Sequence, residues 1–535
     1  MPRLRTAAVA TLLLVPIVAG GFLLQEPPRR TNSRLLLEQV LSLVSSRYVD
    51  SVNGSQLYEK AARGMVRELN DPYSELLSPK QSDSFNRNTN GRYGGTGMLL
   101  EAQQGGAVVV SRVFPHTPAE GAGVQEGDRI VGIDGQSTLD TQEWTLDRIS
   151  EKLRGTPGSQ VSVTYARPGV AEPIKLRFTR AVVHVPAVQF TAMLDSTVGY
   201  IPLQTFNENA AEEVEDAVAK LEGDGARGIV LDMRDNGGGI VDQALAVSSL
   251  FLREGQEIVS VRSRAADPET ARSSGRHIAS AVPLVVLLDG QSASATEIVA
   301  GALQDHDRAL VVGTTSYGKG LVQSVFPLDG GYYLKMTTGK WYTPSGRSIH
   351  RDRKLLPDGR YVEVHPDSLE TDSARAARPA FKSDGGRTVY GGGGITPDVI
   401  VHDDTLSTGE QQFLRSIAAR ASTVQSVLQT YALELKGSVH PGYTPSATWG
   451  DEVLRRLAAA GVSIEPRFAT AARALLAREI DHRVARLALG DAAARRRELM
   501  EDRPLSRAVE LLRHAGSQRD LFAAATVVSS PPGQH

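Results

Sequence analysis

The amino-acid sequence predicts a multidomain protein of the α+β class, and three observations support this prediction. The chain has 535 residues, of which 41% are hydrophobic, and that length is enough for about three to five separately packed domains. The pattern changes from helical periodicity near the N-terminus to short β-rich runs after residue 92. From residue 199 apolar strands alternate with amphipathic helices, and beyond residue 407 only helical spacing remains.

These changes divide the chain into five predicted regions. They are a signal peptide or signal anchor at 1–25, a helical segment at 30–91, a β-rich module at 92–184, an α/β core with a β-α-β sheet at 185–406, and a helical tail at 407–535. Within the core, residues 351–394 are rich in Gly, Pro, Asp and Arg, which predicts an excursion with little regular structure.

The first 25 residues resemble a targeting segment. Arg3 and Arg5 precede an apolar run at 7–24, and a basic region followed by an apolar one is typical of a secretory signal. We therefore expect export to the bacterial periplasm or cell envelope. The run has about 18 residues, close to the minimum that spans a membrane, and no clear A-x-A site follows. Cleavage of the signal and anchoring in the inner membrane both remain open.

Composition excludes several classes of function. The chain has 59 basic and 61 acidic residues, whereas nucleic-acid-binding proteins usually carry a basic surplus. It contains no cysteine, which excludes disulfides, thiolate metal sites and a cysteine nucleophile. We expect no nucleic acid, metal or cofactor.

Periodicity predicts the elements in order. The N-terminal segment shows an apolar helical face with Leu36, Val40, Leu43 and Val44, interrupted by a turn at 70–72. In the β-rich module we expect strands at 107–113, 128–133 and 160–167 and a helix at 141–153. In the core we expect helices at 208–221 (with Gly223 as its C-terminal cap), 240–252 and 294–303, and strands at 228–233, 284–288, 309–312, 321–326, 361–364 and 395–401. Helical spacing continues at 471–477, 484–489 and 494–499.

The stretch 287–323 contains the densest set of chemically active residues, and three motifs in it fit poorly. Gly313–Lys319 matches a phosphate-binding loop, but Gly320 replaces the hydroxyl that binds magnesium and a strand follows instead of a helix. Ser316 and Lys319 match S-x-x-K, which requires one helical turn, whereas glycines flank the lysine. A G-x-S-x-G elbow at Ser292 lacks its final glycine, and only His306 is near enough in sequence to serve as its base.

A fourth interpretation pairs Ser294 with Lys319. Ser294 lies where a buried strand turns into a helix, at the positive end of the helix dipole, so the Ala295 amide could receive an oxyanion. A lysine accepts a proton only when neutral. Its usual pKa is about 10.4, and burial lowers that value by as much as about 3–5. Gln323 could orient the amine if the chain bends near Gly320, since four extended residues span about 13 Å.

Ser294 also has a purely structural interpretation. Ser294 and Glu297 have the spacing of a capping box, in which a serine caps a helix without any catalytic role. On spacing alone both interpretations stay open.

The sequence resembles the C-terminal processing peptidases, serine proteases with a Ser-Lys dyad, over about residues 35–405. The matching strings are ELNDPYSELLSP at 68–79, LDMRDNGGG at 231–239, SASATEIVAGALQD at 292–305, GTTSYGKGLVQ at 313–323 and GGGGITPDV at 391–399. The family usually has Ser where this chain has Thr296.

This resemblance implies a crotonase/ClpP-like core with defined residue roles. Ser294 would be the nucleophile, Lys319 the general base and Gln323 its orienting residue, with Asp305 in support. The oxyanion donors would be Ala295 and Gly238, with Gly239 as the alternative to Gly238.

The β-rich module resembles a PDZ domain through residues 117–136. Gly95, Thr96, Gly97 and Met98 lie where such a domain binds a terminal carboxylate while the peptide adds as a strand. The expected partners are therefore protein or peptide substrates with exposed C-termini.

Two questions remain open in the sequence. A protein with these modules could also be an inactive peptide-binding scaffold, because Thr296 departs from the family pattern. The tail at 407–535 could form a homodimer, dock on the core, or bind an adaptor or activator.

Overall fold

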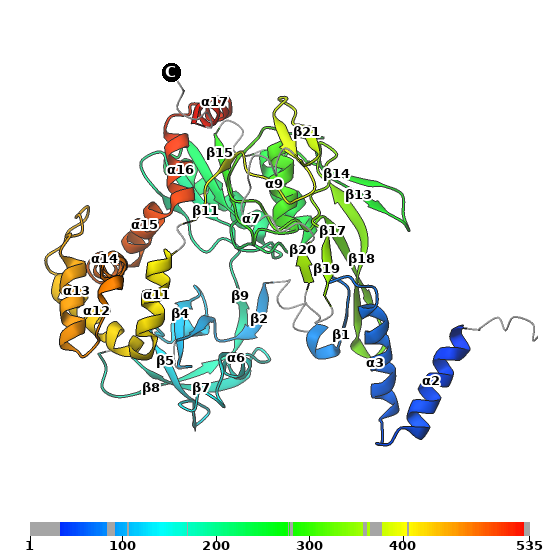
Figure 1. Ribbon diagram of the computed structural model, residues 1–535, viewed down its shortest axis with the longest axis horizontal. Helices are drawn as coiled ribbons and strands as arrows, with labels where there is room; N and C mark the ends of the chain where they lie inside the picture. Colours follow the sequence, from blue (N-terminus) through cyan, green and yellow to red (C-terminus); the bar gives the residue numbers. More distant parts are fainter. Residues whose placement is uncertain are drawn as a thin grey trace, which may run out of the picture. The chain divides into compact units, whose positions relative to one another are not determined.

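The computed structural model describes residues 33–82, 91–103, 106–167, 169–276, 278, 282–356, 361–363, 377–403 and 406–528 (Figure 1). The predicted signal or anchor at 1–25 lies outside the described residues. The chain divides into two compact units, Met1–Leu76 and Leu77–His535. Among the helices that the structure describes, none combines the length and apolarity needed to cross a membrane.

The N-terminal unit contains the predicted helices, but its last element is not helical. Helix α2 (Ser33–Arg47) precedes α3 (Gly54–Arg67), which Asn53 caps through a hydrogen bond from the Ser55 N–H. The short strand β1 (Glu75–Leu77) follows. The predicted turn at 70–72 is present, with a positive φ of 55° at Asn70 and a hydrogen bond from the Ser74 N–H to the Asp71 carbonyl, but a strand rather than a helix follows it.

The β-rich module contains a six-stranded antiparallel sheet and a separate pair of antiparallel strands formed by its two ends. Strand β2 (Arg92–Gly95) pairs with β9 (Ala181–His184) where the module begins and ends. Between them lie β3 (Met98–Ala102), β4 (Val108–Val113), β5 (Arg129–Ile133), β6 (Gln136–Ser137), β7 (Gln160–Ala166), β8 (Ile174–Thr179) and the helices α5 (Pro118–Gly121) and α6 (Leu146–Leu153). The predicted helix at 141–153 is shorter than expected, because Thr145 caps it and it begins at Leu146.

The core is built on a six-stranded sheet in which only the first strand is antiparallel. In spatial order it contains β10 (Ala192–Met193), β11 (Val198–Pro202), β12 (Gly228–Asp232), β15 (Leu284–Leu288), β16 (Leu310–Gly313) and β23 (Val399–Ile400). Its central strands are apolar and fully buried. Such strands are typical of a parallel sheet that is covered on both faces.

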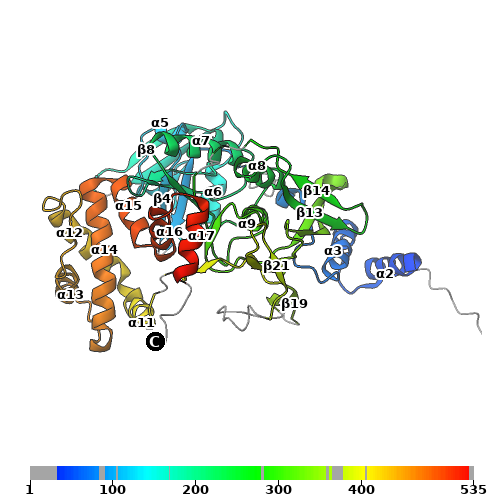
Figure 2. The ribbon, with the colours of Figure 1, turned by 90° about the horizontal axis from the view of Figure 1, so that it is seen from above.

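Helices from two distant parts of the chain cover the two faces of this sheet. Because side chains alternate along a strand, Ile229 and Leu231 pack on one side with α7 (Ala210–Gly223), α8 (Val241–Phe251) and α9 (Ala295–Asp305). Val230 points to the other side, where Leu505, Ala508, Val509, Leu512 and Leu521 of the C-terminal helices α16 (Arg503–Arg513) and α17 (Gln518–Val528) cover it. Figure 2 shows α16 and α17 in red at the end of the chain. These helices of the tail therefore dock on the core.

The rest of the tail has a hydrophobic core of its own. It is formed by α11 (Thr408–Ile417), α12 (Ala421–Leu435), α13 (Trp449–Ala459) and α14 (Ala469–Leu489), with 3-10 turns at Ala418–Arg420 and Pro466–Phe468. Helix α15 (Asp491–Glu501) leads from this bundle to α16.

A second, antiparallel sheet and two short strand pairs complete the core. The sheet joins β17 (Leu321–Pro327), β18 (Tyr333–Tyr342), β13 (Glu257–Ser263) and β14 (Glu269–Arg272), with a 3-10 turn at Asp329–Gly331. In the predicted excursion, β19 (Arg353–Leu355) pairs with β20 (Tyr361–Glu363), and β21 (Ala380–Lys382) pairs with β22 (Thr388–Tyr390).

The structure also corrects the predicted end of α7 and the last strand predicted in the core. Gly223 is the last residue of α7 rather than its cap, and the positive φ of 96° occurs at Gly225, where the chain reverses. The strand expected at 395–401 is reduced to β23, because the Ile395 N–H donates to the Ser316 hydroxyl and Pro397 has no N–H to donate.

Packing of α16 predicts that the tail contributes to the stability of the core. Leu512 is 5% exposed and lies against Gly228 of β12, so Leu512→Ala should lower the free energy of unfolding by about 2–5 kcal/mol in a urea titration. Leu487→Ala is the control, because Leu487 is 38% exposed and a surface substitution usually changes stability by less than about 0.5 kcal/mol. Equal effects of the two variants would contradict this packing.

Candidate active site

Ser294 occupies a strained turn between strand β15 and helix α9. It is the N-cap residue of α9 and has φ 58° and ψ −114°. A positive φ in a residue other than glycine costs on the order of 1–3 kcal/mol and persists only where the surroundings enforce it. Serine nucleophiles of α/β-hydrolases lie on a strand-to-helix turn of this kind. The turn is therefore compatible with catalysis as well as with capping.

Glu297 holds this turn against a loop that is distant in the sequence. Its side chain is fully buried. One carboxylate oxygen, Oε2, accepts hydrogen bonds from the backbone N–H of Ser294 at 2.8 Å and of Lys319 at 2.9 Å. The other, Oε1, accepts from the Ser316 hydroxyl at 2.5 Å and the Gly318 N–H at 2.6 Å. The capping box predicted the bond to Ser294, whereas the three bonds to the loop were not predicted.

Burial and hydrogen bonding act in opposite directions on the Glu297 carboxyl. Removal from water raises the pKa of Glu297, and the hydrogen bonds from Ser316, Lys319, Gly318 and Ser294 oppose that rise because they favour the ionised form. All four contacts are donors, so the carboxylate form fits the site without a change of geometry.

Lys319 lies at the end of this loop, separated from β17 by Gly320. It is partly buried, and its backbone carbonyl accepts a hydrogen bond from the Trp341 indole at 3.0 Å. Gly318 has a positive φ of 81°, and its carbonyl accepts from the Arg351 N–H. Strand β17 begins two residues after Lys319, and its register with β18 shifts between Val322 and Gln323.

Gln323 is placed on β17 beside β18. Its side-chain amide donates to the Thr337 hydroxyl at 3.4 Å. That bond uses the NH₂ group of the side-chain amide. The amide oxygen is therefore the atom that can accept a hydrogen bond from an amine.

The glycine-rich loop after β12 lies against Ser294. A Cβ built on Gly238 would be 3.0 Å from Ser294 Cβ and 2.7 Å from the carbonyl oxygen of Ala293. Only glycine, with its φ of 97° here, allows this close approach. The Asn236 side chain fixes the loop, because its amide donates to the Leu203 carbonyl and its oxygen accepts from the Gly238 N–H at 2.9 Å.

The backbone amides on either side of the Ser294 turn and in the glycine-rich loop include two without an acceptor among the described residues that could serve as oxyanion donors. They belong to Ala295, the first residue of α9, and to Gly239. The Gly238 amide differs, since it already donates to Asn236.

Thr296 connects the serine turn to the glycine-rich loop. Its buried hydroxyl donates to the Asn236 carbonyl at 2.9 Å, and the same carbonyl accepts from the Ala293 N–H at 3.0 Å. A threonine supplies the same hydroxyl donor as a serine, so this substitution keeps the connection.

Asp305, at the other end of α9, holds the segment that follows β18. Its carboxylate pairs with the fully buried Arg347 at 2.7 Å and accepts from the Ser345 N–H at 2.9 Å. The segment after Arg347 contacts the Lys319 loop, where the Arg351 N–H donates to Gly318. These contacts connect Asp305 to that loop through the segment that follows β18.

The three other motifs of the stretch 287–323 are occupied by structural contacts. The Ser292 hydroxyl is buried and donates to the Met233 carbonyl, and Ser316 is buried against Glu297. His306 contacts the Glu257 carbonyl and Asp384 at the opposite end of α9 from Ser294. A loop and strand β17, rather than a helix, follow Gly313. The elbow at Ser292, the S-x-x-K motif and the phosphate loop therefore lack the geometry they need.

The β-rich module contains a separate groove. A cleft of about 800 Å³ lies between β3 and α6 and is lined by Thr96, Met98, Leu100, Leu146 and other residues. Gly97 has a φ of 91°, and its carbonyl accepts from the Phe114 N–H and the Thr117 hydroxyl. The loop 95–98 is thus fixed at one end of an open strand edge.

Three protein-family models match the chain. Residues 197–361 match peptidase family S41, residues 109–167 match the PDZ domain, and residues 28–80 match the N-terminal domain of the activating protease CtpB. In the part of the chain that the structure describes, no group of three or more His, Cys, Asp or Glu could hold a metal ion.

Relatives with established names match more than half of the chain. The carboxy-terminal-processing protease of Bartonella bacilliformis is 37% identical over 316 residues, which are 58% of this chain and 71% of that protein. CtpA, a carboxy-terminal processing protease of Bacillus subtilis, is 31% identical over 348 residues, 65% of this chain and 73% of that one. The solved structure of the photosystem II D1 C-terminal processing protease is 30% identical over 60% of this chain and 91% of that chain, with a TM-score of 0.35. This chain belongs to the carboxy-terminal processing proteases of peptidase family S41.

The contacts of Glu297 predict a large effect of its substitution. In Glu297→Gln an NH₂ group would replace one carboxylate oxygen and would face N–H or O–H donors. The Ser294 turn and the Lys319 loop should therefore shift apart. A displacement of about 1 Å can lower a rate about 10²-fold, and we expect a loss of that order in cleavage of an unfolded protein.

Glu410→Gln is the matched control for this substitution. Glu410 is also buried and forms a capping box, with Ser407 at α11 of the tail. Wild-type activity in Glu297→Gln, or an equal loss in both variants, would contradict the assigned role.

Proposed function

We propose that the protein is a serine endopeptidase in which Ser294 is the nucleophile and Lys319 the general base. The observation that carries this proposal is the single carboxylate oxygen of Glu297 that accepts from the backbone of both residues. Membership of the processing proteases supports the same assignment.

The reaction follows from the chemistry of these groups. The Ser294 hydroxyl attacks the carbonyl carbon of the peptide bond, and its proton passes to the neutral amine of Lys319. The resulting ammonium returns the proton to the leaving amine, which leaves an acyl group on Ser294. Water then attacks this ester with Lys319 again as the base, and the serine is regenerated. We assign Gln323 to orient the amine and Asp305 to support the loop. No step requires a metal or a cofactor.

The oxyanion of the tetrahedral intermediate needs two donors. We propose the amides of Ala295 and of the glycine-rich loop. In that loop Gly238 is closest to Ser294 but already donates to Asn236, so its amide must be shared between two acceptors. Gly239, whose amide has no acceptor in the described part of the chain, is the alternative donor.

The PDZ domain supports a substrate class with free C-termini. We propose that Gly95, Thr96, Gly97 and Met98 bind the terminal carboxylate while the peptide adds to β3 along the groove. The protease would then act on unfolded proteins or exposed tails.

We further propose that the protein works in the bacterial periplasm or cell envelope. The basis is the signal-like sequence at residues 1–25, whose apolar run at 7–24 would form a membrane anchor if it is not cleaved. The match of residues 28–80 to the N-terminal domain of an activating protease is compatible with a homodimer or an activator as partner.

Substitution of either dyad residue should abolish cleavage. We would incubate residues 26–535 with an unfolded protein that ends in apolar residues and map the products by intact mass. Ser294→Ala and Lys319→Ala should each lower the rate by at least about 10³-fold. Ser324→Ala and Lys382→Ala, which remove the same groups elsewhere in the core, should cleave normally.

The outcomes of this assay separate two functions. Full activity of Ser294→Ala would refute the proposed nucleophile. Peptide binding without cleavage by any form, including wild type supplied with a candidate activator, would favour an inactive scaffold.

The proposed peptide groove predicts a separate effect on binding. Leu146 of α6 lines the groove, and Leu146→Glu would place a negative charge where an apolar, C-terminally charged peptide lies. Binding of a fluorescent peptide should weaken at least about tenfold, and amidation of its C-terminus should weaken binding to wild type. Leu139→Glu is the control, because Leu139 is 57% exposed in the same domain. Unchanged affinity in Leu146→Glu would place the peptide elsewhere.

A further inference from the structure

Arg234 is the first residue of the turn that leads from β12 into the glycine-rich loop, and three carboxylates hold its side chain. Its guanidinium binds Asp232 at 2.7 Å, Asp502 at 2.8 Å and Asp403 at 3.1 Å. The Arg234 backbone N–H also donates to Asp232, whose carboxylate accepts from the Tyr200 hydroxyl as well. The direction in which the chain leaves β12 therefore depends on this ionic cluster.

Asp502 is the member of the cluster that comes from the C-terminal tail. Its two carboxylate oxygens have different tasks, since Oδ1 caps α16 by accepting from the Leu505 N–H at 2.9 Å and Oδ2 binds Arg234. The side chain is 25% exposed and that of Arg234 13%. None of the three segments that match family models reaches this residue, since the last of them ends at 361.

The helix that carries Asp502 is fixed on the core. Leu505, Val509 and Leu512 of α16 are buried on the sheet, so the N-terminus of α16 cannot move away without exposing them. Beyond its C-terminus, Gln518 accepts from the Leu284 N–H at 2.8 Å.

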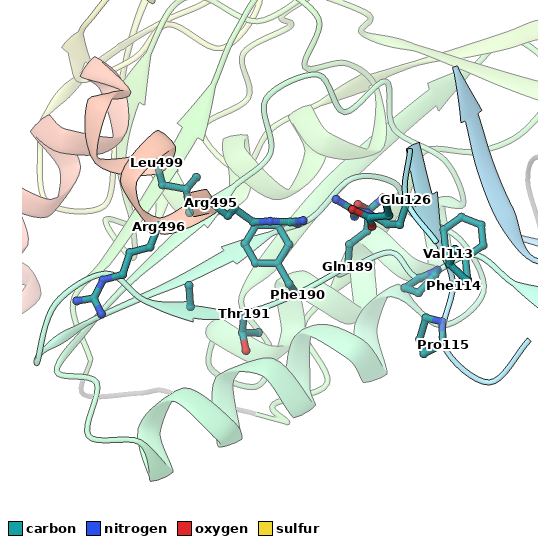
Figure 3. Close-up of a pocket in the computed structure, with 13 residues that line it drawn as sticks. Val113, Phe114, Pro115, Glu126, Gln189, Phe190, Thr191, Arg495, Arg496 and Leu499 are labelled. Atoms are coloured by element: carbon teal, nitrogen blue, oxygen red, sulfur yellow. The ribbon is translucent and has the colours of Figure 1, made fainter. Parts of the chain in front are cut away.

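The same part of the tail also contacts the beginning of the core, on both sides of β10. Arg496 of α15 donates to the Leu194 carbonyl at 2.7 Å, and Arg513 of α16 pairs with Asp195. Figure 3 shows Arg495 over the ring of Phe190, at 4.6 Å from its centroid. Helices α15 and α16 thus contact Phe190, Leu194 and Asp195 around β10 at one place, and Asp502 at the start of α16 contacts Arg234 before the glycine-rich loop.

We propose that Asp502 is a positioning residue for catalysis, through which the C-terminal tail holds Arg234 and with it the oxyanion-binding loop. The expected effect of Asp502 on the cleavage rate rests on the proposed function. The contact by which Asp502 holds the loop through Arg234 does not depend on that function. The charge of Asp502 holds the loop, whereas its capping oxygen stabilises α16.

Two substitutions separate these tasks. Asp502→Asn removes the charge and keeps the helix cap, because asparagine caps as well as aspartate. Asp502→Glu keeps the charge but is a poorer cap. Glu510→Gln is the control, because Glu510 is an exposed residue of α16 that pairs with Arg507 of the same helix and not with the glycine-rich loop as the structure describes it. All variants would be made in the chain of residues 26–535.

The first readout is independent of catalysis. Hydrogen–deuterium exchange would be followed for the amides of Met233, Arg234, Asp235 and Gly238, which donate to Leu287, Asp232, Asp289 and Asn236, respectively. We expect faster exchange there in Asp502→Asn, by about 2- to 30-fold, with no change in Glu510→Gln and less change in Asp502→Glu.

The second readout is steady-state cleavage of the unfolded protein. Asp502→Asn should lower kcat by about 2- to 30-fold with little change in KM, and Asp502→Glu should retain most of the kcat despite a lower melting temperature. Wild-type exchange and kcat in Asp502→Asn would overturn the proposal, as would equal losses in the Asn and Glu variants. If wild type itself shows no Ser294-dependent cleavage, the proposed function fails and the exchange measurement alone decides whether Asp502 holds the loop.

Discussion

The geometry of the candidate active site depends on one buried carboxylate. Glu297 joins the N-terminus of α9 to the loop that carries Lys319, and it accepts four hydrogen bonds from these two segments. An ionised carboxylate without partners would be very costly to bury. The desolvated carboxylate is therefore stable only when both segments are in place. The two oxygen atoms of Glu297 in turn fix the position of each segment. This mutual dependence explains how Ser294 keeps a positive φ that an isolated turn would lose.

The parallel sheet brings the other part of the site to the same place. Strands β12 and β15 are neighbours and run in the same direction, with Asp232 opposite Leu287. Their carboxyl ends therefore release the glycine-rich loop and the Ser294 turn side by side, at the sheet edge where α/β proteins bind ligands. Hydrogen bonds from Ala293 and Thr296 to the Asn236 carbonyl then fix the distance between the two loops.

The sequence was informative where a pattern is local. Continuous apolar runs predicted β12 and β15, with β15 at its correct bounds, and the capping-box spacing predicted the bond between Glu297 and Ser294. Strands β13 and β18 were missed, because β18 is partly buried along nearly its whole length and shows no alternation. The remaining bonds of Glu297 and the pairing of Arg234 with Asp502 join residues far apart in the chain. Only the fold brings such residues together, so no spacing rule could predict them.

Helix α9 has a buried carboxylate at each end. Because the helix dipole has opposite signs at the two ends, the two carboxylates need different partners. Glu297 lies in the first turn, where the positive end of the dipole stabilises a negative charge, and neutral donors are enough to satisfy it. Asp305 is the last residue of the helix, where the dipole is unfavourable to an anion, and it is paired with a fully buried arginine. Removing one member of a buried ion pair leaves an uncompensated charge, so Asp305 and Arg347 are constrained as a pair. Through these two carboxylates α9 is fixed to the Lys319 loop at one end and to the segment that supports this loop at the other.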